Sequence, residues 1–141
     1  MLDKPIHGWS RITIGSWSDR CSYLDDVLDK LCSALTNALT NRHGICYFDA
    51  EGYEYILVFD KGLKCVHILT NDENAEWKYQ TVECPVDELA LEFASDVIAH
   101  IDDWAEWFDK DLSLEKRCQR YVDISKDCLR LVEMVKREVY K

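Results

Sequence analysis

Residues 45–70, ICYFDAEGYEYILVFDKGLKCVHILT, contain the strongest structural signal in this chain. Three runs rich in β-branched and aromatic residues alternate with two short connections, Glu51-Gly52 and Lys61-Gly62. Connections this short that contain glycine join antiparallel neighbours. The stretch therefore predicts a three-stranded antiparallel meander. We place its strands at residues 45–50, 53–60 and 63–70.

Two further strands extend the predicted sheet. Aromatic and polar residues alternate over about 75–83, after a polar loop that begins at Asn71. Near the start of the chain, Ile12 and Ile14 alternate with polar residues, which predicts a strand over residues 8–17. We expect all of these strands to form one antiparallel sheet of about five strands.

Three segments carry apolar residues at helical spacing. The first covers residues 23–41; it follows a serine capping pattern, and Gly44 suits a left-handed stop. Pro85 suits the first position of a second helix, which we expect to run to about residue 110. The third pattern covers residues 114–139. Two antiparallel helices are favoured over one bent helix, because a single rod would be too long for so small a domain.

The predicted element order is β-α-β-β-β-β-α-α. A chain of 141 residues has the length of one domain, so we expect a single domain over residues 1–141. The fold class is α+β, with the helices on one face of the sheet.

The chain is strongly acidic, with 27 acidic and 17 basic residues and a formal net charge of −10. This balance argues against direct binding of nucleic acid or of an anionic membrane, since both require positive charge. No apolar run has the length of a membrane helix, and residues 1–5 lack the apolar core of a signal peptide. We therefore expect a cytoplasmic protein.

Most of the negative charge is concentrated in residues 83–111, which hold ten acidic side chains and one basic side chain, Lys110. Like charges four residues apart, such as Asp102 and Glu106, destabilise an isolated helix by about 0.2–0.5 kcal/mol per pair. One interpretation is a solvated face, or a face paired with basic residues of the following helix. The other is a surface that binds a basic partner. The basic residues in question are Lys116, Arg117 and Arg120.

The candidate partner-binding residues lie along this acidic segment. Trp107 is offset from the apolar seam of the predicted helix, and an aromatic side chain beside carboxylates is typical of a binding hot spot. The full candidate set is Glu92, Asp96, Asp102, Asp103, Glu106, Trp107 and Asp109.

Catalytic signals are weak. His67 shares a strand face with Cys65 and Leu69, but Cys65 is so near in sequence that we expect it at the wrong angle to be a nucleophile. A structural role for His67 is favoured. Phosphate-binding, serine-hydrolase, zinc-protease and EF-hand motifs are absent from the sequence. Acids flank one hairpin, but acids at hairpin ends are usually solvated; they are Asp49, Glu51, Glu54 and Asp60.

Seven cysteines are many for this length, yet no CxxC pair occurs. Zinc sites usually show such close pairs, so free and mostly buried thiols are favoured over a metal site or disulfides. We expect no cofactor and no bound metal.

Residues 7–15 (HGWSRITIG), 22–27 (SYLDDV) and 48–58 (FDAEGYEYILV) resemble small bacterial immunity proteins of contact-dependent growth inhibition systems. The resemblance implies a cytosolic protein of a Gram-negative bacterium that binds and neutralises the C-terminal toxin domain of a delivered effector. Many such toxins are nucleases with basic clefts. The resemblance covers about the first half of the chain and supplies no functional residues.

Two alternatives remain open. The chain could be a small enzyme that uses His67 or the hairpin carboxylates, if these groups converge in one pocket. It could also be an adaptor subunit whose acidic surface meets a basic helix or its own basic segment, residues 112–141.

Overall fold

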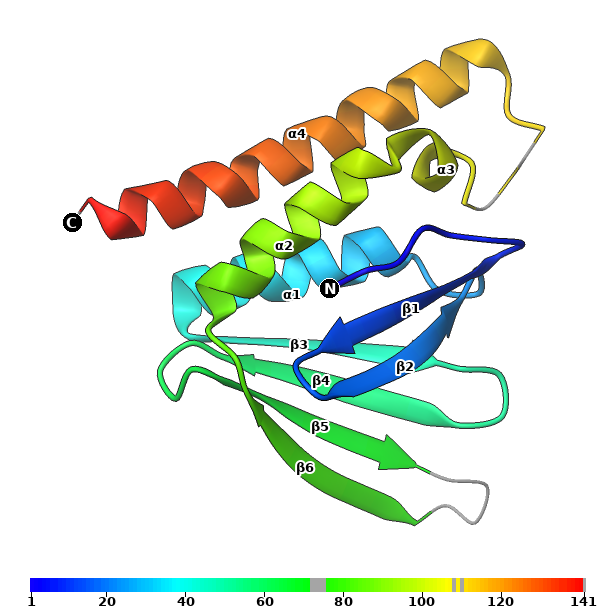
Figure 1. Cartoon of the computed structure of the whole chain (residues 1–141). Helices are drawn as coiled ribbons and strands as arrows, with labels where there is room; N and C mark the ends of the chain where they lie inside the picture. The colour runs from blue at the N-terminus through cyan, green and yellow to red at the C-terminus, as the bar shows by residue number, and fades with distance from the viewer. Residues whose placement is uncertain (72–75, 108, 110, 141) are drawn as a thin grey trace.

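The computed structural model describes residues 1–71, 76–107, 109 and 111–140. The chain has an α+β fold (Figure 1). The strands are β1 (Trp9–Ile14), β2 (Trp17–Ser22), β3 (His43–Asp49), β4 (Glu54–Asp60), β5 (Cys65–Asn71) and β6 (Trp77–Glu83). The helices are α1 (Val27–Asn41), α2 (Val86–Ala99), α3 (Ile101–Ala105) and α4 (Leu114–Val139).

The predicted meander is confirmed. Strands β3 to β6 form a four-stranded antiparallel sheet in the order of the sequence, β3-β4-β5-β6. Side chains of β3 alternate strictly between buried and exposed, and those of β4 between buried and half-buried up to the buried Asp60. The sheet therefore has one face in the core and one face towards solvent.

The prediction of a fifth strand in this sheet is wrong. The segment predicted as one strand over residues 8–17 forms β1 and continues through a tight turn into β2, and these two strands pair only with each other. Gly15 in the turn has φ +56°, which lets the chain reverse at once. The hairpin lies across the core face of the large sheet, where Trp17 packs edge-on against Tyr55 at 5.4 Å between ring centroids.

Helix α1 begins and ends differently from the prediction. It starts at Val27, where the Asp26 carboxylate accepts from the Asp29 N–H at 3.2 Å. The left-handed stop is Arg42, with φ 75°, rather than Gly44. Gly44 lies in β3 beneath the helix, and a Cβ there would lie 1.7 Å from the carbonyl oxygen of Ala34. The glycine is needed for close packing of α1 on β3, not for a turn.

The second predicted helix is also interrupted. Instead of running to about residue 110, it ends at Ala99, and His100 takes a non-helical backbone conformation (φ −130°, ψ 36°) before the short helix α3. The change of direction brings the residues after α3 against the loop that precedes α1. The third predicted helix is confirmed as α4, with Ser113 as its cap.

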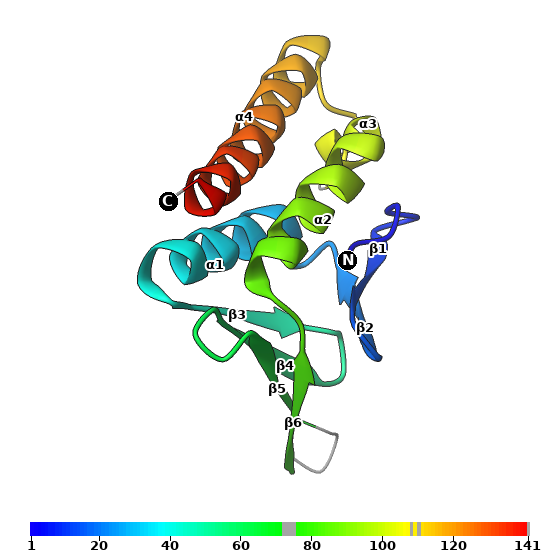
Figure 2. The same ribbon diagram turned by 60° about the vertical axis from the view of Figure 1, so that its left-hand side comes forward.

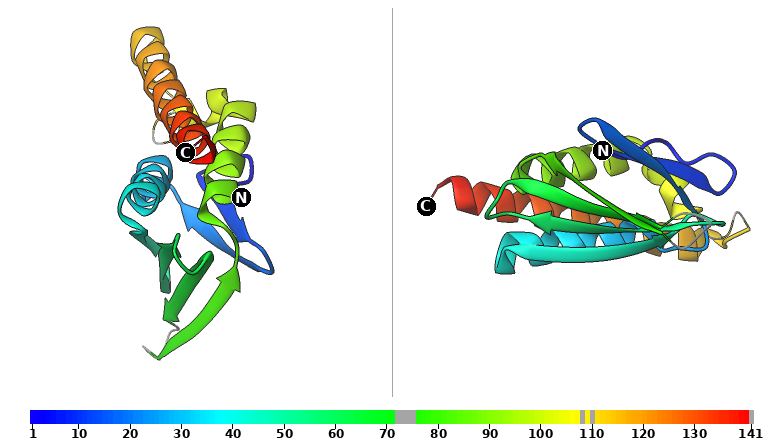
Figure 3. Two further views of the ribbon diagram at one scale, coloured as in Figure 1. Left: turned by 90° about the vertical axis from the view of Figure 1, so that its left-hand side faces the viewer. Right: turned by 90° about the horizontal axis from the view of Figure 1, so that it is seen from below.

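The elements stack to one side of the sheet (Figures 1 and 2). Helix α1 and the β1-β2 hairpin cover the core face, α2 packs against α1, and α4 runs antiparallel to α2 on the outside (Figure 3). Among the described elements, none covers the opposite face of the sheet, which we call the outer face. None of the helices in the described part of the chain is both long and apolar enough to cross a membrane.

Candidate functional site: the outer face of the sheet

The outer face presents sixteen side chains in four cross-strand rows. The rows are Asp49, Glu54, Asn71 and Trp77; Tyr47, Ile56, Leu69 and Tyr79; Ile45, Val58, His67 and Thr81; and His43, Asp60, Cys65 and Glu83. The two middle rows are mainly apolar. The two end rows carry all four carboxylates, and none of the sixteen positions is a lysine or an arginine.

Large apolar and aromatic side chains on this face are exposed. Ile45 is 65% exposed, Trp77 48% and Tyr79 63%. Soluble monomers rarely leave contiguous apolar surface open, and such patches usually mark binding sites. Tyrosine and tryptophan are also the residues that interfaces favour, because each offers an apolar body and a polar tip.

Hydrogen bonds link Glu54 of the first end row to Asn71 of the same row and to Tyr47 of the neighbouring row. The Tyr47 hydroxyl donates to Glu54 Oε2 at 2.5 Å, and the Asn71 side-chain amide donates to Glu54 Oε1 at 3.1 Å. The bond to Glu54 is the main cause that raises the pKa of Tyr47 to about 12, so this phenol stays protonated at neutral pH. The Tyr47 side chain is therefore neutral and held in position by Glu54.

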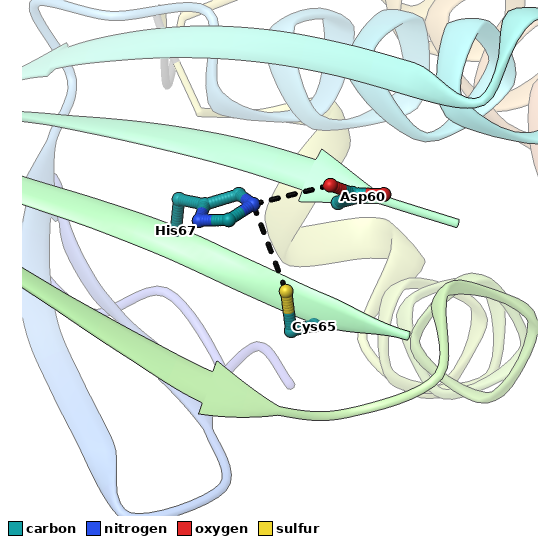
Figure 4. Close-up of side chains that lie close together, drawn as sticks. All are labelled: Asp60, Cys65 and His67. Carbon is teal, nitrogen blue, oxygen red and sulfur yellow. Dashed lines mark hydrogen bonds and ion pairs between the residues drawn. The ribbon is translucent and has the colours of Figure 1, made fainter. Parts of the chain in front are cut away.

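Asp60 and Cys65 of the other end row form a cluster with His67 of the neighbouring middle row (Figure 4). His67 Nε2 lies 3.2 Å from Asp60 Oδ2 and 3.6 Å from Cys65 Sγ. His67 Nδ1 lies 2.8 Å from the Tyr79 hydroxyl. Sequence reasoning placed Cys65 and His67 on one face, which is confirmed, and it expected Cys65 at the wrong angle to be a nucleophile partner of His67.

The cluster does not have the arrangement of a catalytic triad. In a triad, one imidazole nitrogen faces the nucleophile and the other faces the acid. Here the same nitrogen of His67 faces both the thiol and the carboxylate. Burial and the nearby Asp60 charge raise the pKa of Cys65, which disfavours a thiolate nucleophile. The Leu63 N–H and then His67 lower the pKa of Asp60, so it is a carboxylate.

Three of the residues predicted to bind a partner contact other parts of the chain instead. Asp96 Oδ2 accepts from the Leu2 N–H at 2.9 Å, and Glu92 lies 3.5 Å from the Met1 nitrogen. Glu106 pairs with Arg117 of α4 at 2.6 Å. This last contact matches the interpretation in which the acidic segment pairs with the following helix.

Trp107 is not the exposed hot spot that the sequence suggested. It is 6% exposed, packs on Trp104 at 4.9 Å between ring centroids, and donates its indole N–H to the Asp25 carbonyl oxygen at 3.0 Å. The break at His100 explains the difference, because the helix itself does not continue from α2 to this position.

The remaining candidates face solvent. Asp102 is exposed and Asp103 half-buried in the first turn of α3, and neither forms an ion pair with a described residue. Asp109 is exposed, and its carboxylate accepts from the Asp111 N–H at 2.9 Å. The structure thus divides the predicted site: Asp96, Glu106 and Trp107 bind other parts of the chain, whereas Asp102, Asp103 and Asp109, together with the 57% exposed Glu92, remain accessible to a partner.

The outer face was missed by the sequence reasoning, although a signal was present. Residues 55–59 read YILVF, so apolar side chains point to both faces of β4. A strand with only one face in the core normally alternates apolar with polar residues. The unbroken run therefore indicated a second apolar face, which the described helices leave uncovered.

No protein-family model, curated protein or solved structure matches this chain.

Proposed function

We propose that this chain is an immunity protein: a cytoplasmic inhibitor without enzymatic activity that binds a basic toxin domain and blocks it. The observation that carries the proposal is the outer face, which is open, apolar in its middle rows and free of lysine and arginine. The resemblance of the first half of the chain to immunity proteins gives the class of partner.

The charge of the chain supports a basic partner. The outer face carries carboxylates at both of its ends, and the chain as a whole has a net charge of −10. Complementary charge around an apolar centre speeds association and excludes partners of the wrong sign. A toxin that cleaves nucleic acid carries the basic cleft that such a surface would recognise.

The outer face is a better contact surface than the acidic segment. The carboxylates of Asp96 and Glu106 already bind other parts of the chain, and Trp107 is in the core. The proposal therefore moves the interface from residues 83–111 to the sheet.

The test is a pull-down of the tagged chain from its native bacterium, eluted in salt steps and analysed by mass spectrometry. We expect a stoichiometric partner that maps to the C-terminal end of a very large secreted protein. Co-expression with this chain should abolish the toxicity of that partner. A captured protein whose activity the chain leaves unchanged would contradict an immunity function.

Variants then locate the interface. Trp77→Lys places a cation on the outer face and should weaken binding at least tenfold. Gln80→Lys is the matched control, because Gln80 is an exposed residue of the same strand that points to the opposite face. If reversal of Asp102 and Asp103 to lysine weakens binding while Trp77→Lys does not, the interface is the acidic segment instead.

A further inference from the structure

We infer that His43, Asp60, Cys65 and His67 form a binding site for one zinc ion at the end of the outer face. Three donors already converge there: His67 Nε2, Asp60 Oδ2 and Cys65 Sγ lie within 4.8 Å of one another. The inference stands independently of the immunity function.

The donor spacing fits tetrahedral zinc. With zinc bonds of about 2.3 Å to sulfur and about 2.0–2.2 Å to nitrogen and oxygen, neighbouring donors lie about 3.3–3.6 Å apart. The distances from His67 Nε2 are 3.2 Å to Asp60 Oδ2 and 3.6 Å to Cys65 Sγ. Modest side-chain adjustment would therefore admit the ion without moving the strands.

Hydrogen bonds from neighbouring groups already orient two of the ligands, His67 and Asp60. The Tyr79 hydroxyl lies 2.8 Å from His67 Nδ1, so it can accept the Nδ1–H and leave the Nε2 lone pair for the metal. The Leu63 N–H donates to Asp60 Oδ1 at 3.0 Å, which leaves Oδ2 facing the cluster. Such supporting contacts are typical of metal sites.

His43 supplies the fourth ligand. It is the cross-strand neighbour of Asp60, and its Nε2 lies 3.5 Å from Asp60 Oδ2. Its side chain is 59% exposed, so a rotamer change can bring the ring to the metal at little cost. The four ligands then come from β3, β4 and β5, and the ion would link these three strands.

The chemistry favours zinc over calcium or magnesium. A thiolate and two imidazoles are soft or borderline ligands, whereas calcium and magnesium bind oxygen. Binding would release the Cys65 thiol proton to solvent as the zinc–sulfur bond forms, and His67 would bind as the neutral ring. Four protein ligands leave no open position, which is the pattern of a structural site.

Cobalt titration tests the site, because Co²⁺ replaces Zn²⁺ in tetrahedral sites and is coloured. The protein, stripped with a chelator, should bind one equivalent of Co²⁺ with strong visible bands and a sulfur-to-cobalt charge-transfer band. Zn²⁺ should then displace the cobalt. Absence of these bands at one equivalent would overturn the inference.

Variants assign the ligands. Cys65→Ser should abolish the charge-transfer band, and His67→Gln should weaken metal binding at least 100-fold. Tyr79→Phe, which removes only an outer contact, should weaken it about 10–100-fold. Cys118→Ser is the control, because Cys118 is an exposed thiol on α4, and it should leave the spectrum unchanged. An unchanged affinity in His43→Ala would overturn the assignment of the fourth ligand.

A measurement on the unaltered chain tests the site without relying on variants, which could fail to fold. Alkylation followed by peptide mass spectrometry should show that zinc protects Cys65 and leaves Cys118 reactive. Equal labelling of Cys65 with and without zinc would also overturn the site.

Discussion

Trp107 donates its indole N–H to the carbonyl oxygen of Asp25 at 3.0 Å, across 82 residues of sequence. This buried bond connects the segment after α3 to the loop before α1. The bond holds in the interior the aromatic residue that the sequence nominated for binding.

Replacing Trp107 with phenylalanine should therefore affect stability more than binding. The change leaves the Asp25 carbonyl oxygen unpaired in a buried position, and we expect the free energy of unfolding to fall by about 1–3 kcal/mol. Urea denaturation followed by circular dichroism measures it. Trp77→Phe, on the exposed outer face, should stay within about 0.5 kcal/mol. Equal losses in the two variants would show that the bond to Asp25 contributes little.

Asp96, like Trp107, should contribute to stability rather than to partner binding. Asp96→Ala removes the acceptor of the Leu2 N–H, and we expect a loss of about 1–3 kcal/mol, since bonds to charged acceptors are strong. Asp102→Ala is the control, because this exposed acid of α3 forms no ion pair with a described residue. Thermal or urea unfolding distinguishes the two. If Asp96→Ala left the stability unchanged but abolished partner binding, Asp96 would be part of the interface.

Gly44 should not tolerate a side chain. In Gly44→Ala the new methyl would overlap the Ala34 carbonyl, so α1 must shift from β3, at a cost of about 1–3 kcal/mol or more. The matched change is Gly62→Ala, where the new methyl meets only the flexible end of Arg42. Urea denaturation of both variants checks the prediction, and a Gly44→Ala variant as stable as Gly62→Ala would contradict the close packing.

Buried cysteines make the protein sensitive to alkali. Burial raises the pKa of Cys21 and of Cys128 to about 12, from an ordinary value of 9.0. Above pH 9 the unfolded chain loses these protons while the folded chain keeps them, so stability should fall as the pH rises towards 12. Unfolding midpoints between pH 8 and 11 measure the slope, and Cys21→Ala should make it shallower. A slope unchanged in that variant would remove Cys21 as a contributor.

Binding rates measured at several ionic strengths should separate the role of the α3 acids from that of the outer face. If the partner is basic, reversing Asp102 and Asp103 to lysine should slow association and weaken its salt dependence, with little change in dissociation. Trp77→Lys should instead speed dissociation, because it disrupts the apolar contact. Stopped-flow or surface plasmon resonance at several salt concentrations resolves both rates. If reversing Asp102 and Asp103 changed the dissociation rate and Trp77→Lys did not, the contact would lie at α3.

Local pattern was sufficient for the large sheet. The glycine turns after Ala50 and Asp60 and the apolar runs between them predicted β3, β4 and β5 to within a few residues. Local pattern failed at the hairpin, because the two-residue turn Gly15-Ser16 lies inside the segment 8–17 that was predicted as one strand. It also failed at His100, where the helical spacing of apolar residues persists although the helix does not.

The residues of the proposed zinc site show why sequence patterns alone can miss a site. His43, Asp60 and Cys65 are cross-strand neighbours on three strands, so their separation in sequence bears no relation to their distance in space. A search for closely spaced cysteine and histidine residues finds Cys65 and His67, but it cannot add His43 and Asp60, which lie on other strands.

By itself, the sequence determined the fold class, the meander, the helix α4 and the concentration of negative charge, because each depends on the composition or periodicity of a continuous segment. Only the tertiary structure decided which acids face solvent, where Trp107 lies and that one sheet face is uncovered. These properties depend on how segments far apart in the chain pack together. The orientation of α3 turns Trp107 inward, and the stacking of all described helices on one side leaves the outer face open.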